Sequence, residues 1–307
     1  MLEPAVIALR LLQYAGAMIL FGSSLFALYA LPAQGFGSAP ETRWFRPLLI
    51  WSGVGLLAAS LAGLVAQTSV LAGSFGEGLK LSSLGAVVGM GLGRGALIRA
   101  VAAALAVAVL VARKADRNAL VASAALGGIS CASFAWMGHG AATEGPGGTI
   151  HLVSDILHAL AAGVWVGALV AFGGLLFRRA KSVRLDGVLH SALHRFSGVG
   201  SGLVAVLVAS GLVNSWFLVG PERLSGLWTT PYGQLLSLKL VLFVGMLALA
   251  AANRFRLTPA LGAALADGTR EPALRALRRS LMLETGLAVA VLGLVAWFGM
   301  LAPVSAQ

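Results

Sequence analysis

The sequence is poor in charged residues and in cysteine. Asp, Glu, Lys and Arg make up only 11% of its 307 residues, whereas soluble globular domains carry about 25%. Hydrophobic residues reach 58%, so the composition excludes an ordinary soluble domain and indicates a membrane protein. The single cysteine, Cys131, excludes an internal disulfide framework.

Motifs of nucleotide-driven and hydrolytic enzymes are also missing. The sequence contains no P-loop, no GxSxG nucleophile elbow, no HExxH helix and no CxxC pair. These absences favour a transporter-type protein over an enzyme. The net charge of +11 comes from basic residues in short loops between hydrophobic runs, where it sets membrane topology. We therefore expect a lipid bilayer as partner, and no nucleic acid.

Apolar runs of about 20 residues recur along the whole chain, and each is long enough to cross a hydrocarbon core of ~30 Å as a helix. Runs such as AVAVLVA do not alternate, which argues against a β-barrel. We predict an all-α, polytopic membrane helical bundle of about eight transmembrane helices. The predicted spans cover residues 5–31, 48–72, 94–112, 119–138, 150–177, 196–219, 234–255 and 280–302. The glycine-rich segment 73–93 is expected to be interfacial or re-entrant.

Basic residues predict the orientation of these spans. Sixteen of the 22 Lys and Arg residues lie in the loops before span 2 and after spans 3, 5 and 7. Loops that stay in the cytoplasm collect Lys and Arg. These four loops share one side only if both termini lie on the other, so we expect both termini outside.

A polar stripe interrupts the apolar run HLVSDILHALAAGVWVG at residues 151–167. His151, Asp155 and His158 are separated by four and three residues, so they share one face of a helix. Charged groups within a bilayer are costly and usually face a hydrated cavity that holds a partner. We therefore expect a polar site at the outer end of this span.

Met137 and His139, in the stretch FAWMGHG, add a thioether and a third imidazole at the same membrane face. Nitrogen and sulfur donors favour copper over calcium, magnesium or manganese. The predicted metal ligands are thus His139, His151, Asp155, His158 and Met137. The alternative is that each histidine is only a packed or solvated polar group.

His190 and His194, in VLHSALHRFSG, are also four residues apart, but the predicted topology puts them on the cytoplasmic side. They form either a solvated basic linker or an exit site for an ion. Lys239, Asn253 and Glu284 are expected to pair with structural partners inside the membrane.

Four blocks of the second half follow an order that is typical of one family. They are RFS, a YG followed by a lone lysine in an apolar helix, NR at the end of that helix, and LRRS leading to LE. Together with HLVSDILHALAAGVWVGAL, they resemble the copper resistance protein D (CopD) family of bacterial inner-membrane proteins. The likeness covers about residues 135–303. We divide the chain into N-terminal transmembrane helices at 1–134 and a CopD-like transmembrane domain at 135–307.

This resemblance implies a role in copper homeostasis and resistance in the bacterial inner membrane, so the outer side on which we expect both termini is the periplasm. The family is thought to move copper ion from periplasm toward cytoplasm, supplied by a periplasmic copper-binding protein of the CopC type. His139, His151 and His158 match the family's periplasmic-side histidines. Two alternatives stay open: a membrane redox protein whose haem b acts on periplasmic copper, and a non-transporting scaffold for a copper chaperone.

Overall fold

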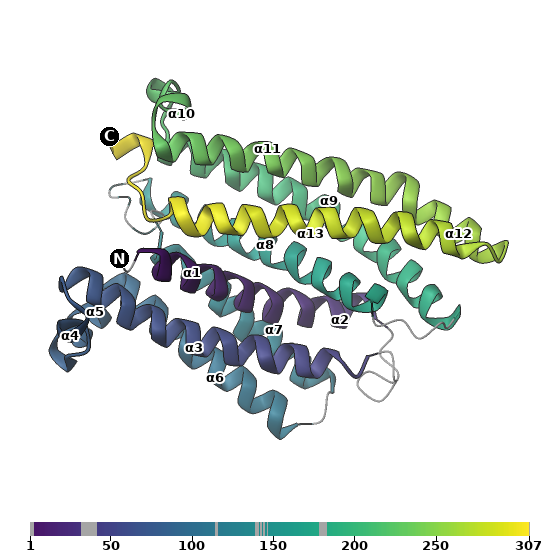
Figure 1. Ribbon diagram of the computed structural model, residues 1–307, viewed down its shortest axis with the longest axis horizontal. Coiled ribbons are helices and arrows are strands. Elements are labelled where there is room, and N and C mark those ends of the chain that lie inside the picture. Colours follow the sequence, from purple (N-terminus) through teal and green to yellow (C-terminus); the bar gives the residue numbers. More distant parts are fainter. Residues whose placement is uncertain are drawn as a thin grey trace.

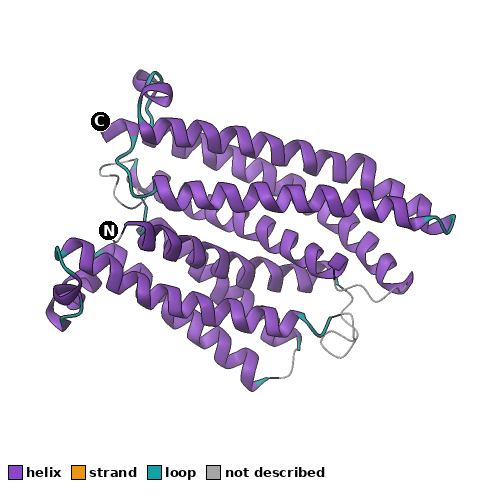
Figure 2. Ribbon diagram, viewed as in Figure 1, coloured by secondary structure: helices purple, strands orange, loops and turns teal. Residues whose placement is uncertain are grey.

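The computed structural model describes residues 3–31, 42–113, 116–138, 141, 143, 145, 147–177 and 183–306. Within these parts all regular structure is helical (Figure 2). Eight segments are long and apolar enough to cross a membrane. They are Glu3–Ala30, Phe45–Leu71, Gly91–Ala112, Arg117–Trp136, Gly148–Phe177, Leu185–Leu218, Pro231–Ala266 and Arg270–Phe298. The prediction of an all-helical bundle with about eight spans is confirmed.

The helices are labelled in Figure 1 in chain order. The first half contains α1 (Glu3–Met18), η1 (Ile19–Ser23), α2 (Ser24–Ala30), α3 (Phe45–Leu71), α4 (Phe75–Gly78), α5 (Leu81–Gly89), α6 (Gly91–Ala112), α7 (Arg117–Ala132) and η2 (Ser133–Trp136). The second half contains α8 (Gly148–Phe177), α9 (Val183–Leu218), η4 (Pro221–Arg223), α10 (Gly226–Thr229), α11 (Pro231–Ala252), η5 (Asn253–Leu257), α12 (Thr258–Ala266), α13 (Arg270–Phe298) and η6 (Val304–Ala306).

Side chains at the helix starts explain where some spans begin. Asp116 precedes α7 and accepts a hydrogen bond from the Ala119 backbone N–H at 2.7 Å, which satisfies one of the free donors of the first turn. This bond, together with the attraction of Arg113, holds the pKa of the Asp116 carboxyl below its usual value. Thr230 caps α11 in the same way, and Pro231 follows at the first helical position.

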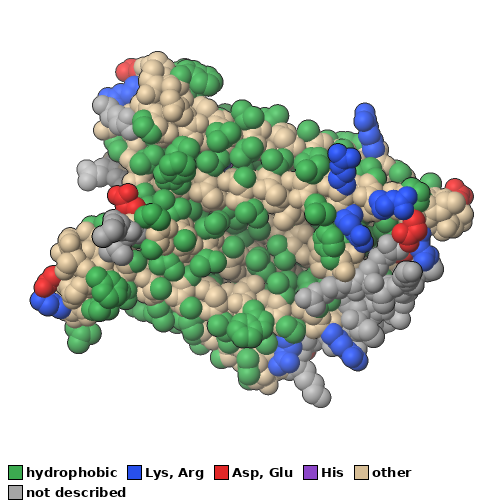
Figure 3. Space-filling model, viewed as in Figure 1, with side chains coloured by type: hydrophobic (Ala, Val, Ile, Leu, Met, Phe, Trp, Pro, Cys, Tyr) green, Lys and Arg blue, Asp and Glu red, His purple; other side chains and the backbone are tan. Residues whose placement is uncertain are grey.

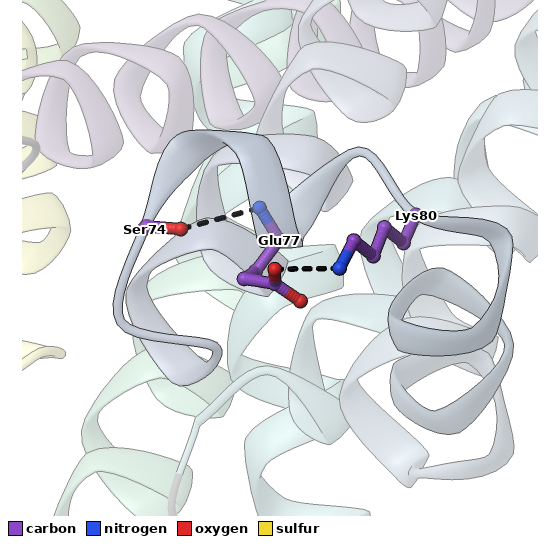
Figure 4. A network of polar contacts seen from close by, with 3 residues as sticks. All are labelled: Ser74, Glu77 and Lys80. Atoms are coloured by element: carbon purple, nitrogen blue, oxygen red, sulfur yellow. Dashed lines mark hydrogen bonds and ion pairs between the residues drawn. The ribbon is translucent and has the colours of Figure 1, made fainter.

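The segment 73–93 forms α4 and α5, which lie with both chain termini at one end of the bundle (Figure 1). Ser74 Oγ accepts from the Glu77 N–H at 3.2 Å, and Lys80 Nζ lies 2.6 Å from Glu77 Oε1 (Figure 4). The nine residues of α5 rise about 14 Å, which is too short to cross the hydrocarbon core. The segment is therefore not a ninth span.

The outer surface of the bundle suits lipid. Large apolar side chains such as Trp51, Leu212 and Val241 are each about two-thirds exposed or more, and apolar side chains are spread over the middle of the face in Figure 3. Soluble proteins rarely expose so large an apolar area. On that face Lys and Arg gather mainly toward the α12 end, opposite both termini. The chain is a multi-pass membrane protein.

The helix α8 is central to the packing. In its most apolar stretch 61% of the residues are buried, against 11% for α9. It crosses η1, a π-helical turn, where Gly22 meets Gly163 and Gly167 so closely that a Cβ on Gly22 or Gly167 would collide with the facing backbone. Ser23 Oγ donates to the Gly167 carbonyl at 2.9 Å. Small residues allow such close approach of membrane helices, which are held by packing and interhelical hydrogen bonds.

We predict that Gly167→Ala destabilises the bundle, because the new methyl group must push α8 away from η1. Overpacking of this kind costs about 1–3 kcal/mol, so the thermal unfolding midpoint of the detergent-purified protein should fall. Gly173→Ala is the matched control, because a Cβ there meets no atom within 4 Å. Equal midpoints for the two variants would contradict the close crossing.

Candidate functional site

A cavity of about 380 Å³ lies between α1, α8, α9, α11 and α13. Its wall includes the first turns of α8 and α11 and the end of α13, all at the end of the bundle that carries both termini (Figure 1). Most of the lining is apolar. The polar side chains in the wall are Tyr14, His151, Asp155, His158, Asn214, Ser215, Tyr232 and Lys239.

The predicted stripe on α8 faces this cavity. His151, Asp155 and His158 all line it, as their spacing on one helical face requires. His151 is buried, whereas Asp155 and His158 are partly exposed toward the space. The structure therefore brings together three of the five predicted metal ligands.

His151 is held by contacts on two sides. Its Nδ1 lies 2.7 Å from Thr143 Oγ1, and its ring stacks on Phe217 of α9 at a centroid distance of 4.7 Å and an interplanar angle of 8°. These contacts fix the plane of the imidazole in the first turn of α8.

Hydrogen bonds also fix the tautomer of His158. Its Nδ1 lies 2.9 Å from Ser210 Oγ, and that hydroxyl donates its one hydrogen to the Val206 carbonyl at 2.6 Å. His158 Nδ1 is therefore the donor to Ser210, and the lone pair of the neutral ring is on Nε2. When one ring nitrogen of a histidine binds a metal, the other usually donates a hydrogen bond to a neighbouring group.

Asp155 has one neutral neighbour and one charged neighbour. Asn214 Nδ2 donates to Asp155 Oδ1 over 3.4 Å, a long bond. Lys239 of α11 lines the same cavity and attracts the Asp155 carboxylate electrostatically. The Lys239 ammonium also lies 5.9 Å from the centroid of the Phe298 ring. The cavity thus holds one acid and one base together with two imidazoles.

The thioether of Met137 does not join this group. Its Sδ accepts a hydrogen bond from Arg99 Nη2 at 2.7 Å, and its side chain lines a smaller cavity in the first half. The next residue, Gly138, lines the large cavity, whereas Met137 does not. His139 lies outside the described residues, so its assignment stays a prediction.

His190 and His194 lie near the other end of α9. His190 packs against Gly262 of α12, and His194 is exposed. Ser210, the partner of His158, is twenty residues further along, or about 30 Å at 1.5 Å per residue. Neither histidine lines the large cavity.

Within the described parts of the chain, no group of three or more His, Cys, Asp and Glu side chains is arranged to hold a metal ion. Copper bound in the large cavity would need further donors, such as an amide, a hydroxyl, a water molecule or a group on the donor protein. Sequence reasoning missed Asn214 and Ser210 as neighbours of the stripe. A polar residue in an apolar helix was the available signal, since both lie in the stretch LVASGLVNSW.

Two of the remaining intramembrane polar residues, Asn253 and Glu284, belong to a hydrogen-bonded cluster with Trp165. Glu284 is buried and accepts from Trp165 Nε1 at 2.8 Å and from Asn253 Nδ2 at 2.7 Å. The predicted pairing is confirmed for Glu284 and Asn253. Lys239 differs, because it lines the cavity.

Comparisons with known proteins converge on one family. The model described as copper resistance protein D matches residues 190–298, and that of the copper resistance protein D-like N-terminal domain matches residues 1–149. A protein named copper resistance protein D from Pseudomonas syringae pv. tomato is 40% identical over 98% of this chain and 97% of its own length. No solved structure matches.

Two further relatives match only part of the chain. Inner membrane protein YebZ of Escherichia coli is 35% identical over 41% of this chain and 41% of its own length. Copper transport protein CutJ of Bacillus subtilis is 34% identical over 38% of this chain and 21% of its own length.

We predict that Glu284→Ala lowers the thermal unfolding midpoint, because it leaves the buried N–H groups of Trp165 and Asn253 without their acceptor. Each unsatisfied buried group costs about 1–3 kcal/mol. Glu222→Ala, at an exposed position in η4, is the control. A Glu284→Ala midpoint no lower than that of the control would show that this cluster does not hold α8, η5 and α13 together.

Proposed function

This chain belongs to the copper resistance protein D family of copper resistance and transport membrane proteins, and we propose that it binds copper ion in the large cavity and moves it toward the cytoplasm. The proposal rests above all on one observation. His151, Asp155 and His158 line a single cavity that opens near one end of the bundle. Imidazole nitrogen is a preferred donor for copper.

Lys239 gives this site a charge that a copper ion can replace. We propose that, without copper, a Lys239 ammonium in the wall of the same cavity offsets the charge of an Asp155 carboxylate, because a lone charge inside the bilayer is costly. A copper ion that binds Asp155 and His158 Nε2 takes over this role and repels Lys239. We propose that this exchange of cations keeps binding weak enough for release, as transport requires.

The distribution of basic side chains supports the proposed direction of copper movement. Basic side chains gather at the end opposite the termini (Figure 3), and the positive-inside rule assigns such an end to the cytoplasm. The cavity then opens to the periplasm of the inner membrane, where we propose that a CopC-type protein delivers copper. His190 and His194, at the cytoplasmic end, are the candidate exit residues.

A haem with two axial imidazoles needs one ligand on each face of the ring. Both imidazoles that the structure describes in the cavity come from α8 and share one helical face, so they do not fit that arrangement. The permease is therefore preferred. A Soret band in the purified protein would reverse this preference.

We predict that replacing His151 and His158 with alanine together weakens copper binding by more than about 100-fold. Loss of a residue that only hydrogen-bonds to a metal ligand commonly lowers metal affinity 10–100-fold. This change removes two proposed ligands themselves. Binding is measured by titration and elemental analysis of the detergent-purified protein, and copper uptake is measured in proteoliposomes.

The matched control is Asp267→Ala, because this side chain is exposed just after α12 and does not line the cavity. It should bind copper like the unmodified protein. Wild-type binding by the double variant would contradict the site. Copper binding without flux in proteoliposomes would identify a scaffold instead of a permease.

We predict that Lys239→Gln tightens copper binding by roughly tenfold, about 1.4 kcal/mol, because the competing cation is lost, and that it slows copper release in flux assays. Lys80→Gln, which changes an exposed lysine near α4, should leave both unchanged. Weaker copper binding by Lys239→Gln would refute the exchange of cations.

A further inference from the structure

A small cavity of about 20 Å³ lies in the first half of the chain, between α1, α3 and α6, with Met137 in its wall. Its lining comprises Val6, Leu9, Arg10, Gln13, Gly63, Leu64, Gln67, Leu92, Ala96, Arg99 and Met137. These residues combine an apolar wall with two cationic side chains and two amides. The described part of the lining contains no Asp or Glu.

Both arginines are buried, with only 7% of Arg10 and 0% of Arg99 exposed. Arg99 Nη1 donates to Ser133 Oγ at 3.0 Å, and Arg99 Nη2 donates to Met137 Sδ. Arg10 Nη2 donates to the Met137 carbonyl at 3.1 Å. Every one of these acceptors is neutral.

Two buried guanidinium nitrogens have no hydrogen-bond acceptor among the described residues, namely Arg10 Nη1 and Arg99 Nε. Asp155 is the nearby acid, but it lines the large cavity, where Lys239 attracts it. Buried charges without a counter-charge are strongly destabilising. Two cations around one small space therefore call for an anion.

We propose that the small cavity binds one monatomic inorganic anion, such as chloride, between Arg10 and Arg99. Its volume suits a particle near the size of one water molecule, which excludes phosphate and carboxylate headgroups. The N–H groups of the two guanidiniums provide charge-assisted hydrogen bonds to the anion. This site is separate from the proposed copper site and does not depend on it.

The anion also has a consequence for the large cavity. A Cβ at Gly299, in the wall of that cavity, would lie 3.1 Å from Arg10 Nη1, so the guanidinium lies just behind the wall. An anion beside Arg10 offsets the repulsion that a cation would meet there. This second point rests on the proposed copper function, whereas anion binding does not.

The test uses full-length protein in detergent, stripped of copper. We expect the thermal unfolding midpoint to rise in a saturable way with sodium chloride or sodium bromide, but not with sodium gluconate at the same ionic strength, because a ligand that binds only the folded state stabilises it. The chloride-35 NMR line should broaden on addition of the protein, and excess bromide should reverse the broadening.

Arg10→Met should abolish both effects. Arg46→Met is the matched control, because Arg46 donates to the Leu110 carbonyl at 2.9 Å at the opposite end of α6, and it should keep both effects.

Ala96→Val, which fills the small cavity and keeps both arginines, should also abolish the halide response and serves if Arg10→Met fails to fold. A halide response that survives both Arg10→Met and Ala96→Val, or an equal response to gluconate, would overturn the proposal. A variant of the large cavity that loses copper binding should still show the halide response, because the two sites are separate.

Discussion

Hydrocarbon offers no hydrogen bonds, and this constraint decides where the polar side chains of the spans can lie. Glu284 is held between the N–H groups of Trp165 and Asn253, and His158 is anchored on Ser210 of the adjacent helix. Each bond joins two helices, so a polar group inside the bundle also fixes how its neighbours are placed. The cavity exists because these bonds and the large apolar side chains around them hold α8, α9, α11 and α13 in place.

The helix α8 connects this network to the first half of the chain. Its glycines meet the π-helical turn η1 almost backbone to backbone, and the Ser23 hydroxyl donates to the Gly167 carbonyl across the contact. The imidazoles and the carboxylate lie on the same helix, about one to four turns earlier. Because one rigid helix carries both the tight contact and the polar stripe, the stripe keeps a fixed position relative to α1, whose Tyr14 lines the same cavity.

The sequence was sufficient to predict whatever depends on a single helix. Run length predicts the eight spans, and a 3.6-residue period predicts that His151, Asp155 and His158 share a face. Contacts between helices could not be predicted, and for this reason Asn214 and Ser210 were missed. Met137 shows another limit: it follows the 3₁₀ turn η2, with about three residues per turn, and its side chain turns toward Arg99. The division at residue 134 stays a prediction, and α8 packs against helices on both sides of it.

Two neighbouring residues, Met137 and Gly138, lie in the walls of two spaces of different charge. Asp155 and Lys239 line a cavity large enough for a hydrated cation, and Arg10 and Arg99 lie around a space of about 20 Å³. Interactions between charges are strong where water is scarce, so the charge state of the small space affects the potential in the large one. A thioether whose sulfur already accepts from a guanidinium is a poor ligand for a cation. The arrangement therefore favours nitrogen and oxygen donors on α8 for copper, and assigns Met137 to the space around the two arginines.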